Sequence, residues 1–157
     1  MSNQPMPYNA ITDKLDRDLL FEFFWKFSFF ECTLKRGGYI KKGRGDTANT
    51  DWQKFGVAIR GRFAEISTVA FNDAVGKLKE LSPRQQIVEN EQIGWRKICL
   101  KPNTSEEEFV LQLLKAVRNN LFHGGKYPDG PVEEIARNNE ILISARITLD
   151  GLFALVD

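Results

Sequence analysis

The feature that most constrains the fold is the repeated spacing of apolar residues at steps of three and four positions. The first such stretch contains Leu15, Leu19, Phe23, Phe27 and Phe30. This spacing puts apolar side chains on one face of an α-helix. Similar patterns predict helices over residues 12–36, 52–66, 69–81, 104–123 and 132–155. The sequence therefore predicts an all-α fold, a single-domain bundle of about five helices.

The predicted domain covers residues 11–157 and follows a loose N-terminal tail at 1–10. Within its first helix, Leu20, Phe24 and Phe29 form a second apolar stripe beside the first. A helix that is apolar on two sides either lies at the centre of a bundle or contacts a second subunit. Both positions remain open from the sequence.

Two stretches lack helical periodicity. Residues 37–49 are rich in glycine and basic side chains, which predicts a mobile basic loop. Residues 84–102 contain short apolar runs on both sides of Gly94. We interpret them as an ordered connector with Trp95 as an anchor, and a short β-hairpin is the alternative.

Charge is distributed unevenly along the chain. The net charge is only +1, but residues 33–62 contain eight basic and two acidic side chains, a local charge of +6. Such a patch can bind the phosphates of RNA, and Lys41, Lys42 and Arg44 are the candidate RNA-binding residues. A basic loop that is merely solvated explains the same composition equally well.

The two cysteines, Cys32 and Cys99, lack the spacing of metal ligands, and we expect reduced, partly buried thiols. The N-terminus does not resemble a signal peptide, and the apolar cluster at 19–30 is too short to span a bilayer. These observations predict a cytoplasmic protein that does not associate with membranes and needs neither a metal nor another cofactor.

The helix predicted at 104–123 has two distinct apolar surfaces. One core face falls within an arc of about 100°. It consists of Val110, Leu113, Leu114, Val117 and Leu121. Leu111 and Phe122 form a second ridge outside this arc. We expect another helix of the chain or a second subunit to cover that ridge.

Three polar residues end the same helix: Arg118, Asn119 and His123, the only histidine of the chain. An imidazole can take the proton from a ribose 2′-hydroxyl, and a guanidinium can stabilise negative charge on the attacked phosphate. Asn119 can orient the imidazole or donate a hydrogen bond to the phosphate. The three residues are thus candidate catalytic residues for metal-independent RNA cleavage. Alternatively, Arg118 and His123 only complement the negative end of the helix dipole before Gly124 and Gly125.

The stretch from Arg118 to His123, Arg-Asn-Asn-Leu-Phe-His, resembles the R-x4-6-H motif of HEPN (higher eukaryote and prokaryote nucleotide-binding) domains. Its continuation through Gly124-Gly125-Lys126 is similar to one prokaryotic branch of that family. Gly125 occupies the place of a tyrosine found in antitoxin-paired HEPN toxins, so the chain departs from that branch.

The resemblance implies a helical bundle, a homodimer and a metal-independent endoribonuclease in a toxin–antitoxin or phage-defence system, with a cognate antitoxin or regulatory protein as a further partner. It assigns catalysis to Arg118, Asn119 and His123, and a two-fold axis would bring two copies of the motif into one cleft. Other members of the family are non-catalytic modules that bind RNA, nucleotides or proteins. The family therefore leaves a binding module as the alternative function.

Overall fold

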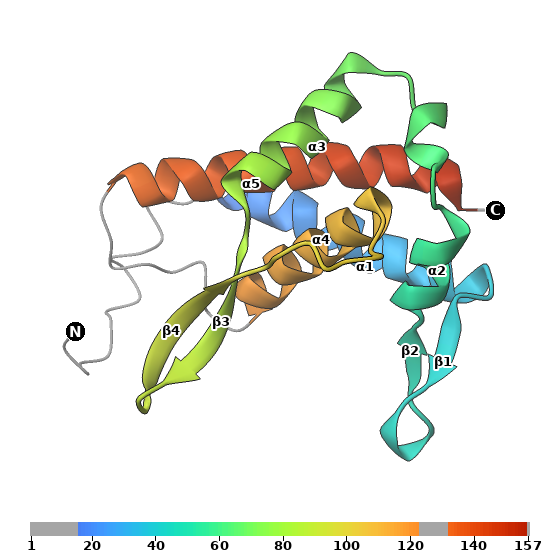
Figure 1. The fold of residues 1–157 in the computed structure, drawn as a ribbon, viewed down its shortest axis with the longest axis horizontal. Coiled ribbons are helices and arrows are strands. Elements are labelled where there is room, and N and C mark those ends of the chain that lie inside the picture. Colours follow the sequence, from blue (N-terminus) through green and yellow to red (C-terminus); the bar gives the residue numbers. More distant parts are fainter. Residues whose placement is uncertain (1–15, 123–131, 157) are drawn as a thin grey trace.

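The computed structural model describes residues 16–122 and 132–156, which form a layered group of helices with two protruding hairpins (Figure 1). Its α-helices are α1 (Arg17–Arg36), α2 (Trp52–Ala58), α3 (Val69–Leu81), α4 (Glu106–Phe122) and α5 (Val132–Leu152). Short 3-10 segments are η2 (Arg44–Asp46), η3 (Arg62–Glu65) and η4 (Phe153–Leu155). Helix α5 packs against both α1 and α3, while α4 packs against α2, α3 and α5.

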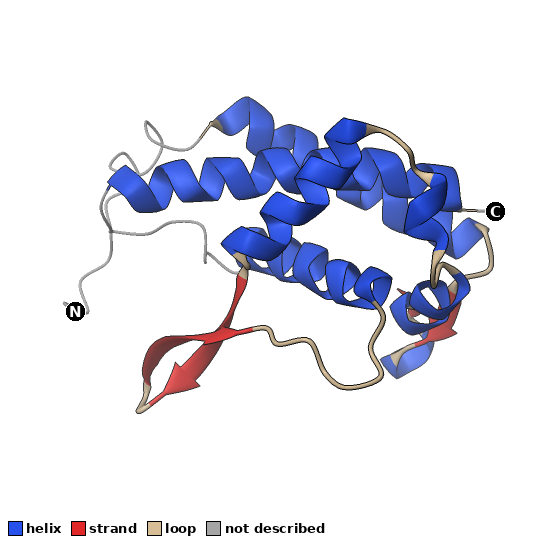
Figure 2. Ribbon diagram, turned by 45° about the horizontal axis from the view of Figure 1, so that its top comes forward, coloured by secondary structure: helices blue, strands red, loops and turns tan. Residues whose placement is uncertain are grey.

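The prediction of an all-α fold is wrong, because two antiparallel hairpins accompany the helices (Figure 2). The first hairpin pairs β1 (Ile40–Lys42) with β2 (Ala48–Thr50) and, except for Thr50, occupies part of the stretch 37–49 that was predicted as a loop. The second pairs β3 (Arg84–Glu89) with β4 (Gln92–Lys97), so the hairpin alternative for this stretch is the correct one.

From the sequence, the first hairpin was not expected and the second was only an alternative, because both lack the strongest signals of a hairpin. Strand β1 is exposed along its whole length, so no alternation of apolar and polar residues marks a buried face. The turn between β3 and β4 consists of Asn90 and Glu91, both with positive φ (49° and 61°). Two-residue hairpin turns of this kind normally carry glycine at the second position. A glutamate in that place hides the turn from a sequence pattern.

Helix boundaries follow local capping interactions. Helix α1 begins at Arg17, and the Asp16 carboxylate accepts a hydrogen bond from the Leu19 amide at 3.1 Å. The predicted cap at Thr12 lies outside the described residues. Helix α2 ends at Ala58 instead of continuing to residue 66, because Gly61 turns the chain with φ 74°. Helix α3 has the predicted bounds.

The hydrophobic core lies between the helices and contains the described inner residues predicted for α1 and α4, with Leu121 packed against it. Leu15, also predicted as an inner residue, lies outside the described residues. Ion pairs join the outer edges of α1 and α5, one between Lys26 and Asp150 at 2.6 Å and one between Glu22 and Arg146. They hold α1 in register along α5.

Leu111 is covered by another helix of its own chain, which is the first of the two alternatives expected from the sequence. Its side chain is only 2% exposed and belongs to the core of its own chain. The cover comes from α2, where Gly56 allows a close approach to α4: a Cβ at that position would lie 2.8 Å from Glu108 Cγ and 3.5 Å from Leu111 Cδ1. The side chain of Phe122, the other residue of the predicted ridge, lies outside the described part of the structure.

Both cysteines, Cys32 and Cys99, are exposed, which corrects the prediction of partly buried thiols. Within the described ranges, no helix combines the length and the apolar composition needed to cross a bilayer.

Candidate functional site

Helix α4 positions the candidate site and is fixed at its N-terminus by a capping box. The Ser105 amide donates to Glu108 Oε2 at 2.9 Å, and the Glu108 amide donates to Ser105 Oγ at 3.1 Å. The Glu108 carboxylate also accepts two hydrogen bonds from Arg60, at 3.0 and 3.1 Å. The hydrogen bonds from Arg60 and then from Ser105 lower the pKa of Glu108 to about 2. These contacts tie the segment after α2 to the start of α4.

Arg118 and Asn119 lie near the C-terminal end of α4 and contact each other. Arg118 Nη1 donates to Asn119 Oδ1 at 3.0 Å, so the amide orients the guanidinium. Asn119 is exposed and Arg118 is half-buried. His123 lies outside the described residues, so the structure does not place the third candidate catalytic residue.

Arg118 also lines an open pocket of about 160 Å³ between α1 and α4. The other lining residues are Phe23, Phe24, Phe27, Ser28, Glu31 and Leu121. Arg118 therefore lies at a concave surface and not inside the hydrophobic core.

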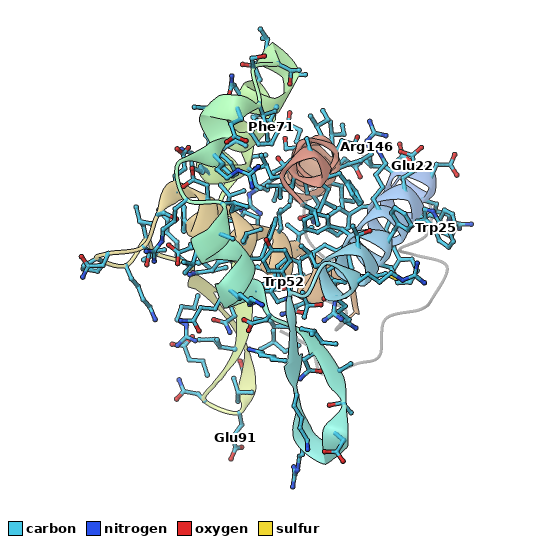
Figure 3. The ribbon with its side chains drawn as sticks, turned by 90° about the vertical axis from the view of Figure 1, so that its right-hand side faces the viewer. Glu22, Trp25, Trp52, Phe71, Glu91 and Arg146 are labelled. Carbon is cyan, nitrogen blue, oxygen red and sulfur yellow. The ribbon has the colours of Figure 1, made fainter. Side chains whose placement is uncertain are left out.

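Two cations of α4 lie over two neighbouring aromatic rings. Lys115 Nζ is 6.0 Å from the centre of the Trp52 ring, and the Arg118 guanidinium carbon is 6.0 Å from the centre of the Phe27 ring. These two rings are themselves 5.5 Å apart. Figure 3 shows Trp52 between the ribbons of α1 and α2. We call Lys115, Trp52, Phe27 and Arg118 the cation–aromatic row, since cations within about 6 Å of a ring centre are attracted by it.

Lys115 is a site residue that the sequence did not single out. Burial lowers the pKa of its ammonium, the charge of Lys41 lowers it further, and Glu31 acts in the opposite direction. Lys115 precedes Arg118 by three positions and therefore lies on the same side of the helix. The charge of Lys41 on β1 thus acts on a lysine that shares one side of α4 with Arg118. Its three-residue spacing from Arg118 was the only available signal.

Glu31 of α1 is a second site residue missed from the sequence. It lines the pocket that holds Arg118, and its charge acts on Lys115. Its position in the sequence, 87 residues before Arg118, contains no hint of this proximity. The site consequently combines two cations with one carboxylate.

Asn120 anchors the second hairpin to the end of α4. Its side chain is 6% exposed, and its Nδ2 donates to the main-chain oxygen of Arg84 at 2.8 Å. This bond places the base of the β3–β4 hairpin next to the residues of the motif, as the position of α4 between the hairpins in Figure 1 indicates. Asn120 is part of the Arg-Asn-Asn-Leu-Phe-His motif, but the sequence predicted no role for it.

The predicted RNA-binding residues lie on the first hairpin and are all exposed. Lys41 and Lys42 belong to β1, and Arg44 begins η2 at the hairpin tip. Lys42 forms an ion pair with Asp46, so part of its charge is compensated. Of these three residues, Lys41 is the one whose charge acts on Lys115 of the cation–aromatic row.

Comparison with protein-family models, curated proteins and solved structures finds no significant match. Among the side chains that the structure describes, no group of three or more His, Cys, Asp or Glu could hold a metal ion.

Proposed function

We propose that the protein is a metal-independent endoribonuclease with an HEPN-type composite site at a homodimer interface. The observation that supports it best is the cation–aromatic row, which ends in Arg118 at an open pocket. The row offers two cations for phosphates and the half-buried ring of Trp52 beside them, whereas Phe27 is buried. Single-stranded RNA is bound by such combinations of positive charge and aromatic rings.

Cleavage would proceed by attack of a ribose 2′-oxygen on the adjacent phosphorus. His123 takes the 2′-hydroxyl proton while Arg118, held by Asn119, stabilises the charge on the phosphorane-like transition state. The bond from phosphorus to the 5′-oxygen breaks, and the imidazolium of a His123 side chain donates a proton to the leaving 5′-oxygen. The products are a 2′,3′-cyclic phosphate and a 5′-hydroxyl.

The direct test is incubation of purified protein with single-stranded RNA in excess EDTA. Wild type is expected to cleave, and His123→Ala and Arg118→Ala are expected to lose about 100-fold or more of the rate, the size typical of a lost general base or charge stabiliser. Arg96→Ala removes an exposed arginine of β4 and serves as the matched control. Equal rates in wild type and His123→Ala, or no cleavage by wild type, would reject the nuclease.

The products provide an independent check. A substrate with a single 2′-deoxy nucleotide at the cleavage site should resist the enzyme, because it lacks the attacking oxygen. Cleavage of that substrate, or a 5′-phosphate on the product, would exclude the proposed chemistry.

A non-catalytic module that binds RNA, a nucleotide or a partner protein is the second candidate. The specific observation in its favour is Glu31, whose negative charge in the Arg118 pocket opposes binding of a phosphate in the deepest position. RNA binding that depends on Lys115 and Arg118, without turnover under any condition, would favour this function.

A further inference from the structure

The outer face of α1 exposes an unusual number of aromatic side chains. Phe21 is 62% exposed, Phe24 39%, Trp25 64% and Phe29 59%. They are four of the five large aromatic side chains that are exposed in the described parts of the chain. Figure 3 shows Trp25 on the side of α1 that points away from α5.

These residues lie together on one face of α1. At about 100° per residue, Phe21, Trp25, Ser28 and Cys32 fall within an arc of about 60°, opposite the buried Phe23. Phe24 and Phe29 flank this arc. We call this surface the α1 outer face. Phe24 and Ser28 also line the Arg118 pocket, so the face and the pocket are continuous.

The charges on α1 disfavour nucleic acid as the occupant of this face. Glu22 and Lys26 are already paired with residues of α5. The other charged side chains of the helix are Arg17, Asp18, Glu31, Lys35 and Arg36. Three are basic and two are acidic, which leaves a net charge of +1 over twenty residues. A surface that binds RNA nonspecifically requires a stronger positive field.

The same charges fit a second copy of the chain in antiparallel orientation. Asp18 near the start of α1 and Arg36 at its end lie on the same edge of the outer face, since they are separated by five full helical turns. A two-fold axis level with residues 26 and 27 therefore places Asp18 of each copy opposite Arg36 of the other. The axis also places Trp25 against Ser28, and Phe21 against Cys32, of the second copy.

The aromatic area is sufficient for such a dimer. With roughly 200 Å² per aromatic side chain, the four exposed fractions leave roughly 450 Å² of surface on each copy. Two copies together bury roughly 900 Å² of it, and at the apolar share of about 65% found in homodimers the whole interface reaches about 1,400 Å². Stable interfaces bury about 1,200–2,000 Å².

We propose that a second copy of the chain docks on the α1 outer face in antiparallel orientation and forms the missing wall of the Arg118 pocket. The contribution to cleavage rests on the proposed nuclease function, whereas the docking surface does not. This dimer contact differs from the ridge predicted on the motif helix, because Leu111 is buried in its own chain.

Sedimentation or light scattering of the full chain at micromolar concentration tests the interface. Wild type is expected to be a dimer. Trp25→Glu should raise the dissociation constant of the dimer at least about 30-fold for each of the two substituted copies, because each substitution removes one interface hot spot. Trp95→Glu changes an exposed tryptophan on β4 in the same way and should remain dimeric. Circular dichroism verifies that both variants fold.

Cross-linking tests the orientation. In a Cys99→Ser background, Phe21→Cys should form a covalent dimer with the native Cys32 of the second copy under mild oxidation, and Cys32→Ser should abolish it. A monomeric wild type, or equal dimerisation of Trp25→Glu and wild type, would overturn the proposal. A monomer in which Trp25→Glu weakens binding of single-stranded RNA would overturn it as well and assign the face to base stacking.

RNA cleavage separates the two proposals. A dimer that is broken by Trp25→Glu but never cleaves RNA removes the nuclease function and leaves the docking surface intact. A monomeric Trp25→Glu variant that cleaves at the wild-type rate shows that the second copy does not complete the pocket.

Discussion

Replacement of Lys115 by methionine should weaken RNA binding without destabilising the protein. Methionine keeps most of the aliphatic length that packs near Trp52 but removes the ammonium. In the folded protein, burial and the nearby charge of Lys41 lower the pKa of this ammonium, so its charged form is disfavoured before RNA arrives. A phosphate that binds between Lys41 and Lys115 would relieve this repulsion.

The expected magnitudes follow from these contacts. Loss of one phosphate contact to single-stranded RNA reduces the slope of log K against log salt by about 0.7, which is about a fivefold loss of affinity at about 0.1 M salt. The free energy of unfolding should change little. Loss of the cation–ring contact costs about 0.5–1 kcal/mol, and relief of the buried charge offsets this cost.

Fluorescence anisotropy over a salt series, with His123→Ala as the background to prevent cleavage, measures the affinity, and urea unfolding measures the stability. Lys77→Met, on the exposed side of α3, is the matched control and should leave the salt slope unchanged. If Lys115→Met keeps the wild-type slope and loses more than about 1 kcal/mol of stability, Lys115 has a packing role and the reasoning is refuted.

Three further predictions concern the scaffold of the site. Glu108 has a pKa of about 2 in the folded protein, below its ordinary value, so its contribution is complete above about pH 4.5 and disappears as the pH falls towards 2. Glu108→Gln should therefore be less stable than wild type by about 1–2 kcal/mol at neutral pH, and urea titrations should find this difference vanishing near pH 2. Gly151→Ala should cost about 1–3 kcal/mol, because its Cβ would lie 2.2 Å from Phe71 Cδ2. Phe71→Leu in the same chain should recover part of that loss in thermal unfolding, and no recovery would argue against the clash. Asn120→Ala should cost about 1–2 kcal/mol by leaving the Arg84 carbonyl without its donor. Asn120→Asp should cost more in the same assay, since a carboxylate repels that carbonyl, and equal losses would show that the bond is unimportant.

Some parts of the structure could be predicted because their causes are local. The inner faces of α1 and α4 follow from the spacing of apolar residues, and the capping box at Ser105 follows from a glutamate three residues later. The bounds of α3 follow from Thr68 as a cap and from the Ser82-Pro83 sequence after its last residue. Such signals lie within a few positions of the structure they determine.

The candidate site was predictable only in part. Arg118 and Asn119 were recognised by their place at the end of an amphipathic helix, and the structure leaves Asn119 exposed and Arg118 half-buried. Lys115 and Glu31 could not be recognised, because their importance depends on Trp52 and on the neighbouring pocket. Those partners come from α1 and α2 and are distant in sequence.

The sequence by itself determined where helices form, which face of each is buried and which polar residues end α4. Only the tertiary structure showed the first hairpin and decided in favour of the second, since β1 is exposed throughout and β3 has no alternating burial. It also decided that α2 covers Leu111 and that the aromatic side chains on the outer side of α1 stay exposed. The physical reason is that periodicity records which side of an element is apolar, but only packing decides what covers that side.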